Sequence, residues 1–208
     1  MNILIADDHA IVRKGLVQLL REEFPAVNIT EADNSMDVCD RARDKIWDII
    51  LLDISMPGRN GVEVLKQLRA DGIKAPILML SMHPEEQYAL RVLKAGASGF
   101  LNKESATNEL VSAIHKVLAG RKYISASLAE KLAEGAGSSD RPAHELLSDR
   151  EMQVFQLLAS GKTVSEIADE IQLSVNTIST YRTRILEKLS LANNAQLARY
   201  ALDNNLVK

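Results

Sequence analysis

Residues 46–58 read Ile-Trp-Asp-Ile-Ile-Leu-Leu-Asp-Ile-Ser-Met-Pro-Gly, an apolar run that ends in a carboxylate and is followed by a turn signal. Four successive apolar residues, Ile49 to Leu52, are typical of a strand buried on both faces of a parallel sheet. The carboxylate at the end of this strand, Asp53, is either an incidental surface charge or the floor of a site. The ends of the other strands decide between these two interpretations.

Strand-like apolar runs alternate with helical patterns over the first 120 residues. The predicted strands are 2–6, 27–32, 48–52, 77–80 and 98–101, and the predicted helices are about 10–23, 35–45, 60–70, 84–95 and 105–118. Five strand–helix units in alternation predict a doubly wound α/β fold, in which helices cover both faces of a five-stranded parallel sheet.

The rest of the chain has a different pattern. A linker is indicated by Gly-Ala-Gly-Ser-Ser-Asp-Arg-Pro at 135–142, and a short helix at about 125–134 precedes it. Four α-helices are then predicted at about 148–159, 164–171, 175–189 and 194–205. The first two begin at capping boxes, Ser-Asp-Arg-Glu at 148–151 and Thr-Val-Ser-Glu at 163–166. We therefore expect a domain at 1–120, a linker with a short helix at 121–145, and a four-helix domain at 146–208.

Composition narrows the class of protein. The 208 residues are 46% hydrophobic and 25% charged, which is ordinary for a globular protein, and the net charge of −3 argues against a wholly basic coat for nucleic acid. The single cysteine, Cys39, allows no intrachain disulfide and suits a reducing compartment. No apolar stretch approaches the ~20 residues that span a bilayer, and the start of the chain does not resemble a signal peptide. We expect a cytoplasmic protein that does not bind membranes.

The candidate site residues follow four of the five predicted strands. Asp7 and Asp8 come after the first strand, Asp53 after the third, Ser81 after the fourth, and Lys103 shortly after the fifth. The carboxyl ends of parallel strands share one edge of the sheet, so these side chains are expected to lie together. The sequence therefore favours a site over an incidental charge, although the acidic pair could also serve only as negative charge at a helix N-terminus.

The expected cluster has a definite chemistry. Three carboxylates about 4 Å apart repel one another, and need a cation or a raised pKa. Oxygen ligands without a Cys or His ligand suit a hard ion, most plausibly Mg²⁺. An ionised Asp53 beside Mg²⁺ can attack a phosphoryl group to form an acyl phosphate, with Lys103 and Ser81 binding the transferred group.

Residues 1 to about 120 resemble the receiver domain of two-component response regulators. The resemblance is carried by Asp7-Asp8, by Asp-Ile-Ser-Met-Pro-Gly at 53–58, and by Ser81 and Lys103. It implies that Asp53 is the phosphoacceptor, that Asp7, Asp8, Asp53 and the backbone carbonyl of Ser55 hold Mg²⁺, and that Lys103 and Ser81 assist. Ser81 and Phe100 fall at the family's switch positions, although an apolar strand would place Phe100 in the core in any case. The implied phosphoryl donor is a sensor histidine kinase or a small acyl phosphate.

Residues 163–188 have the spacing of a helix-turn-helix, with a short turn at 172–174. Apolar residues of the second helix form one stripe, and polar or basic side chains lie off it. Residues 146–208 resemble the LuxR-type DNA-binding domain of NarL/FixJ response regulators. By that resemblance the candidate DNA contacts are Asn176, Ser179, Thr180, Tyr181, Arg182, Thr183, Arg184 and Lys188. Arg182 could instead lie along the inner edge of the helix, and Lys188 could be a solvated helix end.

Charge counting favours two copies on DNA. From residue 148 onward, seven Lys and Arg residues are matched by seven Asp and Glu residues. One copy therefore has few cations to displace DNA counterions, and a homodimer on two half-sites would gain effective concentration. The implied partners are a sensor histidine kinase, double-stranded promoter DNA, a second copy of the chain and, at a promoter, RNA polymerase.

The expected function is a phosphorylation-dependent, DNA-binding transcriptional regulator that catalyses nothing except its own phosphoryl acceptance and hydrolysis. Two alternatives remain open. One is an aspartate-nucleophile phosphatase-like enzyme, which is weakened because the position two residues after Asp53 is Ser55 rather than an acid. The other is a phosphorylation-independent regulator that uses its receiver as a dimerisation module.

Overall fold

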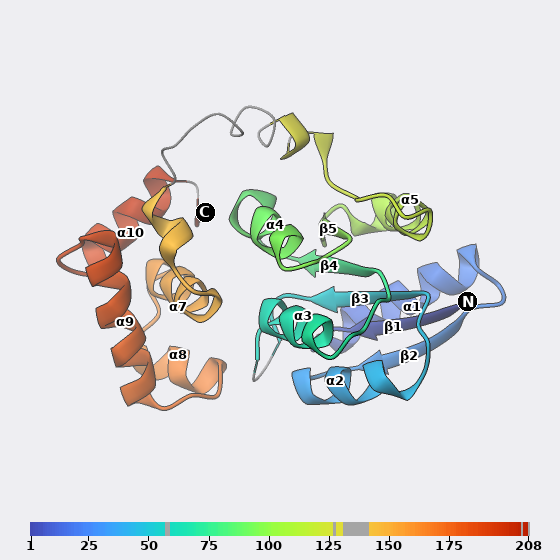
Figure 1. Ribbon diagram of the computed structural model, residues 1–208. Coiled ribbons are helices and arrows are strands. Elements are labelled where there is room, and N and C mark those ends of the chain that lie inside the picture. Colours follow the sequence, from blue (N-terminus) through green and yellow to red (C-terminus); the bar gives the residue numbers. More distant parts are fainter. Residues whose placement is uncertain (57–58, 127, 131–141, 205, 208) are drawn as a thin grey trace. The chain divides into compact units, whose positions relative to one another are not determined.

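The computed structural model describes residues 1–56, 59–126, 128–130, 142–204 and 206–207, apart from the side chains of Glu86 and Thr107 (Figure 1). The chain divides into two compact units, Met1–Ala133 and Glu134–Lys208. The predicted linker 135–142 lies, except for Pro142, outside the described residues. Of the predicted short helix 125–134, residues 125, 126 and 128–130 are described, and all of these except Ser125 are helical. No helix in the described part is long and apolar enough to cross a membrane.

The first unit is built on a five-stranded parallel sheet, as the strand–helix alternation predicts. Its strands are β1 (Asn2–Ala6), β2 (Asn28–Ala32), β3 (Ile49–Asp53), β4 (Ile77–Ser81) and β5 (Gly99–Asn102), in the order β2-β1-β3-β4-β5. The strand order reverses between β1 and β3, which is the point where ligands bind in doubly wound sheets. Asp7 directly follows β1 and Asp53 ends β3, so both acids lie at this switch point.

Helices cover both faces of the sheet (Figure 1). The helices are α1 (Ala10–Glu23), α2 (Ser35–Asp44), α3 (Gly61–Ala70), α4 (Glu85–Lys94) and α5 (Ala106–Leu118). The apolar side chains of α1 and α5 pack on alternate strand residues such as Ile5 and Leu51, while α2, α3 and α4 lie over the opposite face. All five residues of β3 are buried, because neighbours flank the strand on both sides and helices cover both of its faces. A carboxylate at its end is thus desolvated by the architecture itself.

The second unit is helical throughout its described residues. It comprises the 3₁₀ turn η1 (Ala143–Leu146) and the helices α7 (Asp149–Ala159), α8 (Val164–Glu170), α9 (Val175–Leu189) and α10 (Asn194–Asp203). Both predicted capping boxes are present, at Ser148 with Glu151 and at Thr163 with Glu166. The side chains of Ser174 and Asn193 cap α9 and α10. The small core is formed by buried side chains from all four helices, among them Phe155, Ile167, Ile178, Ile185 and Leu197.

One glycine allows the site strand and the next helix to approach closely. The amide of Gly61, the first residue of α3, donates to the carbonyl of Ile54 over 2.8 Å. A Cβ atom at Gly61 would lie 2.0 Å from the backbone oxygen of Asp53. Any larger residue must therefore displace the backbone that carries Asp53.

We expect Gly61→Ala to destabilise the first unit by roughly 1–3 kcal/mol, because the clash is with backbone rather than with a flexible side chain. The measurement is urea unfolding followed by the fluorescence of Trp47, the only tryptophan, which is 4% exposed and reports on this unit. Gly15→Ala is the control, because no atom lies within 4 Å of a Cβ at this position in α1, and alanine should there be neutral or stabilising. Equal stabilities of the two variants would contradict the expected clash.

Candidate functional site

The predicted acidic cluster is assembled at the carboxyl edge of the sheet. Asp7 and Asp53 are fully buried, and Asp8 is partly exposed. Ligand atoms of Asp7, Asp8, His9 and Asp53 all lie within 4.8 Å of one another. His9 precedes α1 as its N-cap residue, and its Nδ1 atom lies 2.8 Å from an oxygen of Asp8. The residues between β1 and α1 and the last residue of β3 thus form one pocket of negative charge.

Lys103 lies between two of these acids. Its Nζ atom is 2.6 Å from Oδ2 of Asp7 and 2.9 Å from Oδ2 of Asp53, and its side chain is only 5% exposed. The backbone amide of Lys103 donates to the carbonyl of Ser81 over 2.8 Å, so the loop after β5 is held against the end of β4. The structure therefore brings together the acid, hydroxyl and lysine positions that the sequence separates by up to 96 positions along the chain.

Burial and charge shift the ionisation of this cluster. Burial raises the pKa of Asp53 from 3.8 to about 6; Lys103 opposes the shift, and Asp7 adds to it. Burial alone would lower the pKa of Lys103, but the carboxylates of Asp53 and Asp7 raise it overall. One ammonium among three carboxylates thus leaves the pocket with an excess of negative charge.

The donor set fits a hard divalent cation. Among the described residues, Oδ2 of Asp7 and Oδ2 of Asp53 share the single ammonium of Lys103. Oδ1 of Asp8 contacts the ring of His9, and Oδ1 of Asp53 has no ion pair in the described part of the chain. Buried carboxylates whose charge is only partly compensated still carry a desolvation penalty. An oxygen-seeking ion such as Mg²⁺ would remove this penalty, and would take these carboxylates and the carbonyl of Ser55 as ligands.

Ser81 ends β4 beside this pocket and is fully buried. Its Oγ atom accepts a hydrogen bond of 2.9 Å from the backbone amide of His83. The Nε2 atom of His83 lies 3.3 Å from Oγ of Ser55, and the His83 ring lies against that of Tyr88 on α4, with 5.4 Å between the ring centroids. Sequence reasoning missed His83, because the spacing of the histidines gives no sign that this one would bridge Ser55 and α4.

Phe100 is 2% exposed in β5, as a residue of an apolar strand should be. The structure adds a feature that the sequence did not indicate. Tyr123 pairs with the edge of β5: its amide donates to the carbonyl of Ser98, and its carbonyl accepts from the amide of Phe100, each over 3.0 Å. The strand that carries Phe100 is therefore bonded to the segment that leaves the first unit.

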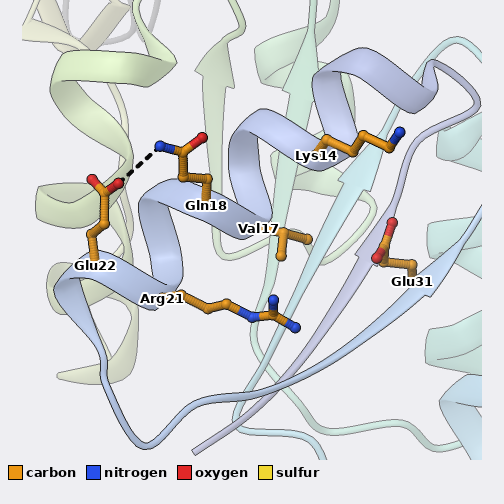
Figure 2. Close-up of a pocket in the computed structure, with 6 residues that line it drawn as sticks. All are labelled: Lys14, Val17, Gln18, Arg21, Glu22 and Glu31. Atoms are coloured by element: carbon orange, nitrogen blue, oxygen red, sulfur yellow. Dashed lines mark hydrogen bonds between the residues drawn. The ribbon is translucent and has the colours of Figure 1, made fainter.

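A shallow hollow of about 520 Å³ lies elsewhere, beside α1 (Figure 2). It is lined by Lys14, Val17, Gln18, Arg21, Glu22 and Glu31. Its two basic and two acidic side chains balance, and Gln18 donates to Glu22 over 3.0 Å. None of these residues belongs to the acidic cluster, and the candidate site remains the pocket around Asp53.

The helix-turn-helix spacing predicted from the sequence is present as α8, a turn and α9. Of the candidate DNA contacts, Asn176, Ser179, Thr180, Thr183, Arg184 and Lys188 are exposed, while Tyr181 and Arg182 are half-buried. The Nε atom of Arg182 donates to Oδ1 of Asn194 over 2.7 Å and ties α9 to α10. The exposed polar residues lie on one side of α9, opposite its buried residues Ile178, Ile185 and Leu189.

Lys188 takes part in a contact inside the second unit. Its Nζ atom lies 2.6 Å from Oε2 of Glu151, whose side chain is only 4% exposed. Burial would raise the pKa of Glu151, but hydrogen bonds from Lys188 and from Ser148 lower it overall. The pair thus joins the start of α7 to the end of α9 and fixes the orientation of α9.

Two family models match the chain. Residues 3–115 match the response regulator receiver domain, and residues 145–201 match the bacterial regulatory proteins of the luxR family. The chain is 32% identical over 208 residues to the response regulator UvrY of Escherichia coli strain K12. The aligned region covers 99% of this chain and 95% of UvrY. The chain is 38% identical over 206 residues to BvgA, a virulence-factor transcription regulator of Bordetella pertussis, with 99% and 98% covered.

Solved structures show the same architecture. RcsB from Salmonella enterica serovar Typhimurium, bound to the promoter rprA in the presence of the phosphomimetic BeF₃⁻, matches with a TM-score of 0.68 and 28% identity, covering 96% of this chain and 97% of that chain. A structure of two RcsB dimers bound to two parallel DNAs matches with a TM-score of 0.61 and 27% identity, with the same coverage.

The raised pKa of Asp53 makes the stability of the first unit depend on pH when no divalent ion is bound. The folded state holds the Asp53 proton up to pH of about 6, whereas the unfolded chain releases it near 3.8. The free energy of unfolding should therefore fall as the pH rises from about 4 to 6, by roughly 3 kcal/mol from this group. The measurement is urea unfolding in chelator, followed by Trp47 fluorescence.

Asp53→Asn cannot ionise, and should lose this part of the pH dependence. Asp40→Asn is the matched control, because the side chain of Asp40 is 70% exposed on α2 and should leave the dependence unchanged. A stability difference between the wild type and Asp53→Asn that stays constant between pH 4 and 6 would mean that the carboxyl group of Asp53 is not desolvated.

Lys188→Met should destabilise the second unit by roughly 1–2 kcal/mol, because the carboxylate of Glu151 is buried but Lys188 is 40% exposed and Glu151 keeps its hydrogen bond from the amide of Ser148. Hydrogen exchange of the α7 and α9 amides, read by mass spectrometry in the full chain, measures the effect. Lys162→Met is the control: the Lys162–Glu170 pair is 40% and 44% exposed, and such pairs contribute about 0–1 kcal/mol. Equal protection losses in the two variants would contradict a special role for the Lys188 pair.

Proposed function

Because the chain belongs to the response regulators that join a receiver domain to a LuxR-type DNA-binding domain, we propose that it regulates transcription through phosphoryl transfer to Asp53. The boundaries that we propose are 1–120 for the receiver, 121–145 for the linker with its short helix, and 146–208 for the DNA-binding domain. The observation that carries the proposal is the buried ion-pair cluster in which Lys103 contacts both Asp7 and Asp53.

In the proposed reaction a carboxylate oxygen of Asp53 attacks the phosphorus of the donor. A new O–P bond forms, and the P–N bond of a kinase phosphohistidine, or the P–O bond of an acyl phosphate, breaks, with its electron pair leaving on the donor. The ammonium of Lys103, already beside Asp53, stabilises charge on the transferred oxygens. Mg²⁺ bound by Asp7, Asp8, Asp53 and the carbonyl of Ser55 would supply further charge neutralisation. The protein itself contributes positioning and no turnover of an external substrate.

Ser81 connects this chemistry to the surrounding fold. Its hydroxyl oxygen now accepts from the amide of His83. A hydroxyl that turns to donate to a phosphoryl oxygen would loosen that bond, and with it the contacts of His83 to Ser55 and to Tyr88 on α4. Phosphorylation would thereby change the contacts of α4 through the His83 side chain.

The second part of the switch is proposed to act through β5. Phe100 is buried, and the amide of Phe100 is bonded to the carbonyl of Tyr123. The contact between β5 and Tyr123 is tightly packed, since a Cβ atom on Gly99 would lie 2.6 Å from the same carbonyl oxygen of Tyr123. A change in the packing of Phe100 would therefore reach the chain segment that leads toward the DNA-binding domain.

DNA binding is proposed to use the exposed face of α9 and two copies of the chain. This rests on the likeness to RcsB, whose structures contain promoter DNA and dimers. On α10, Leu197 and Ala201 belong to the core, while Leu202 is 57% exposed and remains available to a second copy. A cytoplasmic location, a sensor histidine kinase as donor and contact with RNA polymerase at the promoter complete the proposal.

The test compares the wild-type protein with Asp53→Asn. Acetyl phosphate with Mg²⁺ should add one phosphoryl group to the wild type, measured by intact mass, and none to the variant. Phosphorylation should change the affinity for DNA by roughly 5- to 150-fold, the usual range of coupling between two sites. Suitable DNA comes from a selection of random-sequence duplexes with the phosphorylated protein, and affinity is measured by fluorescence anisotropy.

Asp40→Asn, an exposed acid on α2, is the control and should behave as the wild type in both measurements. Phosphorylation of the Asp53→Asn variant to the wild-type level would show that Asp53 is not the acceptor. The same affinity of the wild-type protein for DNA with and without acetyl phosphate would contradict the proposed regulation of DNA binding by phosphorylation.

A further inference from the structure

The exposed face of α9 carries two threonines whose hydroxyl groups are already used. Oγ1 of Thr180 donates to the backbone carbonyl of Asn176 over 2.9 Å, and Oγ1 of Thr183 donates to the carbonyl of Ser179 over 3.1 Å. Both side chains are exposed. A hydroxyl group has one proton, so neither threonine can donate to a base without breaking its helix bond. Each hydroxyl oxygen can still accept a hydrogen bond, and the group that each threonine presents beside it is its methyl group.

Two of the three cations of α9 are already engaged in contacts within the second unit. The usual guanine contact is a bidentate Arg or Lys. Arg182 is bonded to Asn194, and Lys188 is paired with Glu151. Arg184 is the remaining basic residue of this fully described helix, and the exposed carboxylate of Glu187 lies one turn from Thr183 on the same face. The two threonines therefore form a small, partly apolar centre of the face, with Arg184 as the cation beside it.

We infer that α9 recognises thymine, through contact of the Thr180 and Thr183 methyl groups with the C5-methyl group of the base in the major groove. The inference rests on the proposed DNA-binding function and adds the chemistry of the readout. Apolar contact with the thymine methyl group is available to a threonine methyl group, and the major groove is where that group is displayed. The helix bonds hold the hydroxyl groups in place, which aims the two methyl groups without further loss of side-chain freedom.

The experiment separates the methyl contact from DNA binding itself. A duplex recovered by selection from random sequence is prepared with thymine and, in parallel, with uracil in place of every thymine of the half-sites. Affinities of the full-length phosphorylated protein for the two duplexes give a uracil/thymine ratio of dissociation constants. Removing one contacted methyl group should weaken binding by about fourfold, the value of one buried methylene group. We expect this weakening for each contacted thymine.

Variants of the two threonines then assign the effect to their methyl groups. Thr180→Ser and Thr183→Ser keep the hydroxyl group and lose the methyl group, so each should lower the uracil/thymine ratio. Thr180→Val and Thr183→Val keep a methyl group and lose the hydroxyl group, so each should retain the ratio. Thr177→Ser is the control, because Thr177 is half-buried and contacts the capping residue Ser174, and its ratio should equal that of the wild type. Circular dichroism checks that every variant is folded.

Three outcomes would overturn the inference, and they differ in their meaning. Equal wild-type affinities for the thymine and uracil duplexes would overturn the methyl readout and leave DNA binding intact. A ratio that persists in both serine variants would assign the uracil effect to DNA shape rather than to these side chains. Failure to recover or bind any duplex would overturn the proposed function and the inference together.

Discussion

The placement of the Lys103 ammonium between the carboxylates of Asp7 and Asp53 is the interaction on which the account depends. The parallel sheet brings the ends of β1 and β3 together at its switch point, and burial there would strongly disfavour three ionised acids. One ammonium compensates only part of this charge. The pocket is therefore poised for a cation, which would neutralise the remaining carboxylate charge, and for a phosphoryl group, which would bond to Asp53 beside Lys103.

Two bonded routes lead away from this pocket through the first unit. One passes from Ser81 to His83 and on to Tyr88 of α4 by a hydrogen bond and a ring contact. The other uses β5, whose edge is occupied by Tyr123 at the level of Phe100. Each route consists of a few hydrogen bonds or ring contacts at the edge of the buried apolar sheet. A change of one group at the pocket can thus move these contacts while the core stays as it is.

Much of the fold follows from the sequence because periodicity reports burial directly. The buried run Ile49 to Leu52 predicts a central strand, and the five strands and nine of the helices lie within a few residues of the predicted ranges. Contacts made by single side chains carry no such signal. The bridge from His83 to Ser55, the pairing of Tyr123 with β5 and the Lys188–Glu151 pair all join residues distant in sequence. Their partners depend on tertiary geometry, which periodicity does not encode.

The most direct measurement of the central claim is a crystal structure of the full chain with Mg²⁺ and beryllofluoride, the stable mimic of a phosphoryl group. The account predicts beryllium bonded to an oxygen of Asp53, one fluorine contacting Nζ of Lys103, another accepting from the hydroxyl of Ser81, and Mg²⁺ held by Asp7 and Asp8. Beryllofluoride bound at a different acid, or Lys103 still bridging Asp7 and Asp53 with no adduct formed at saturating beryllofluoride, would contradict it.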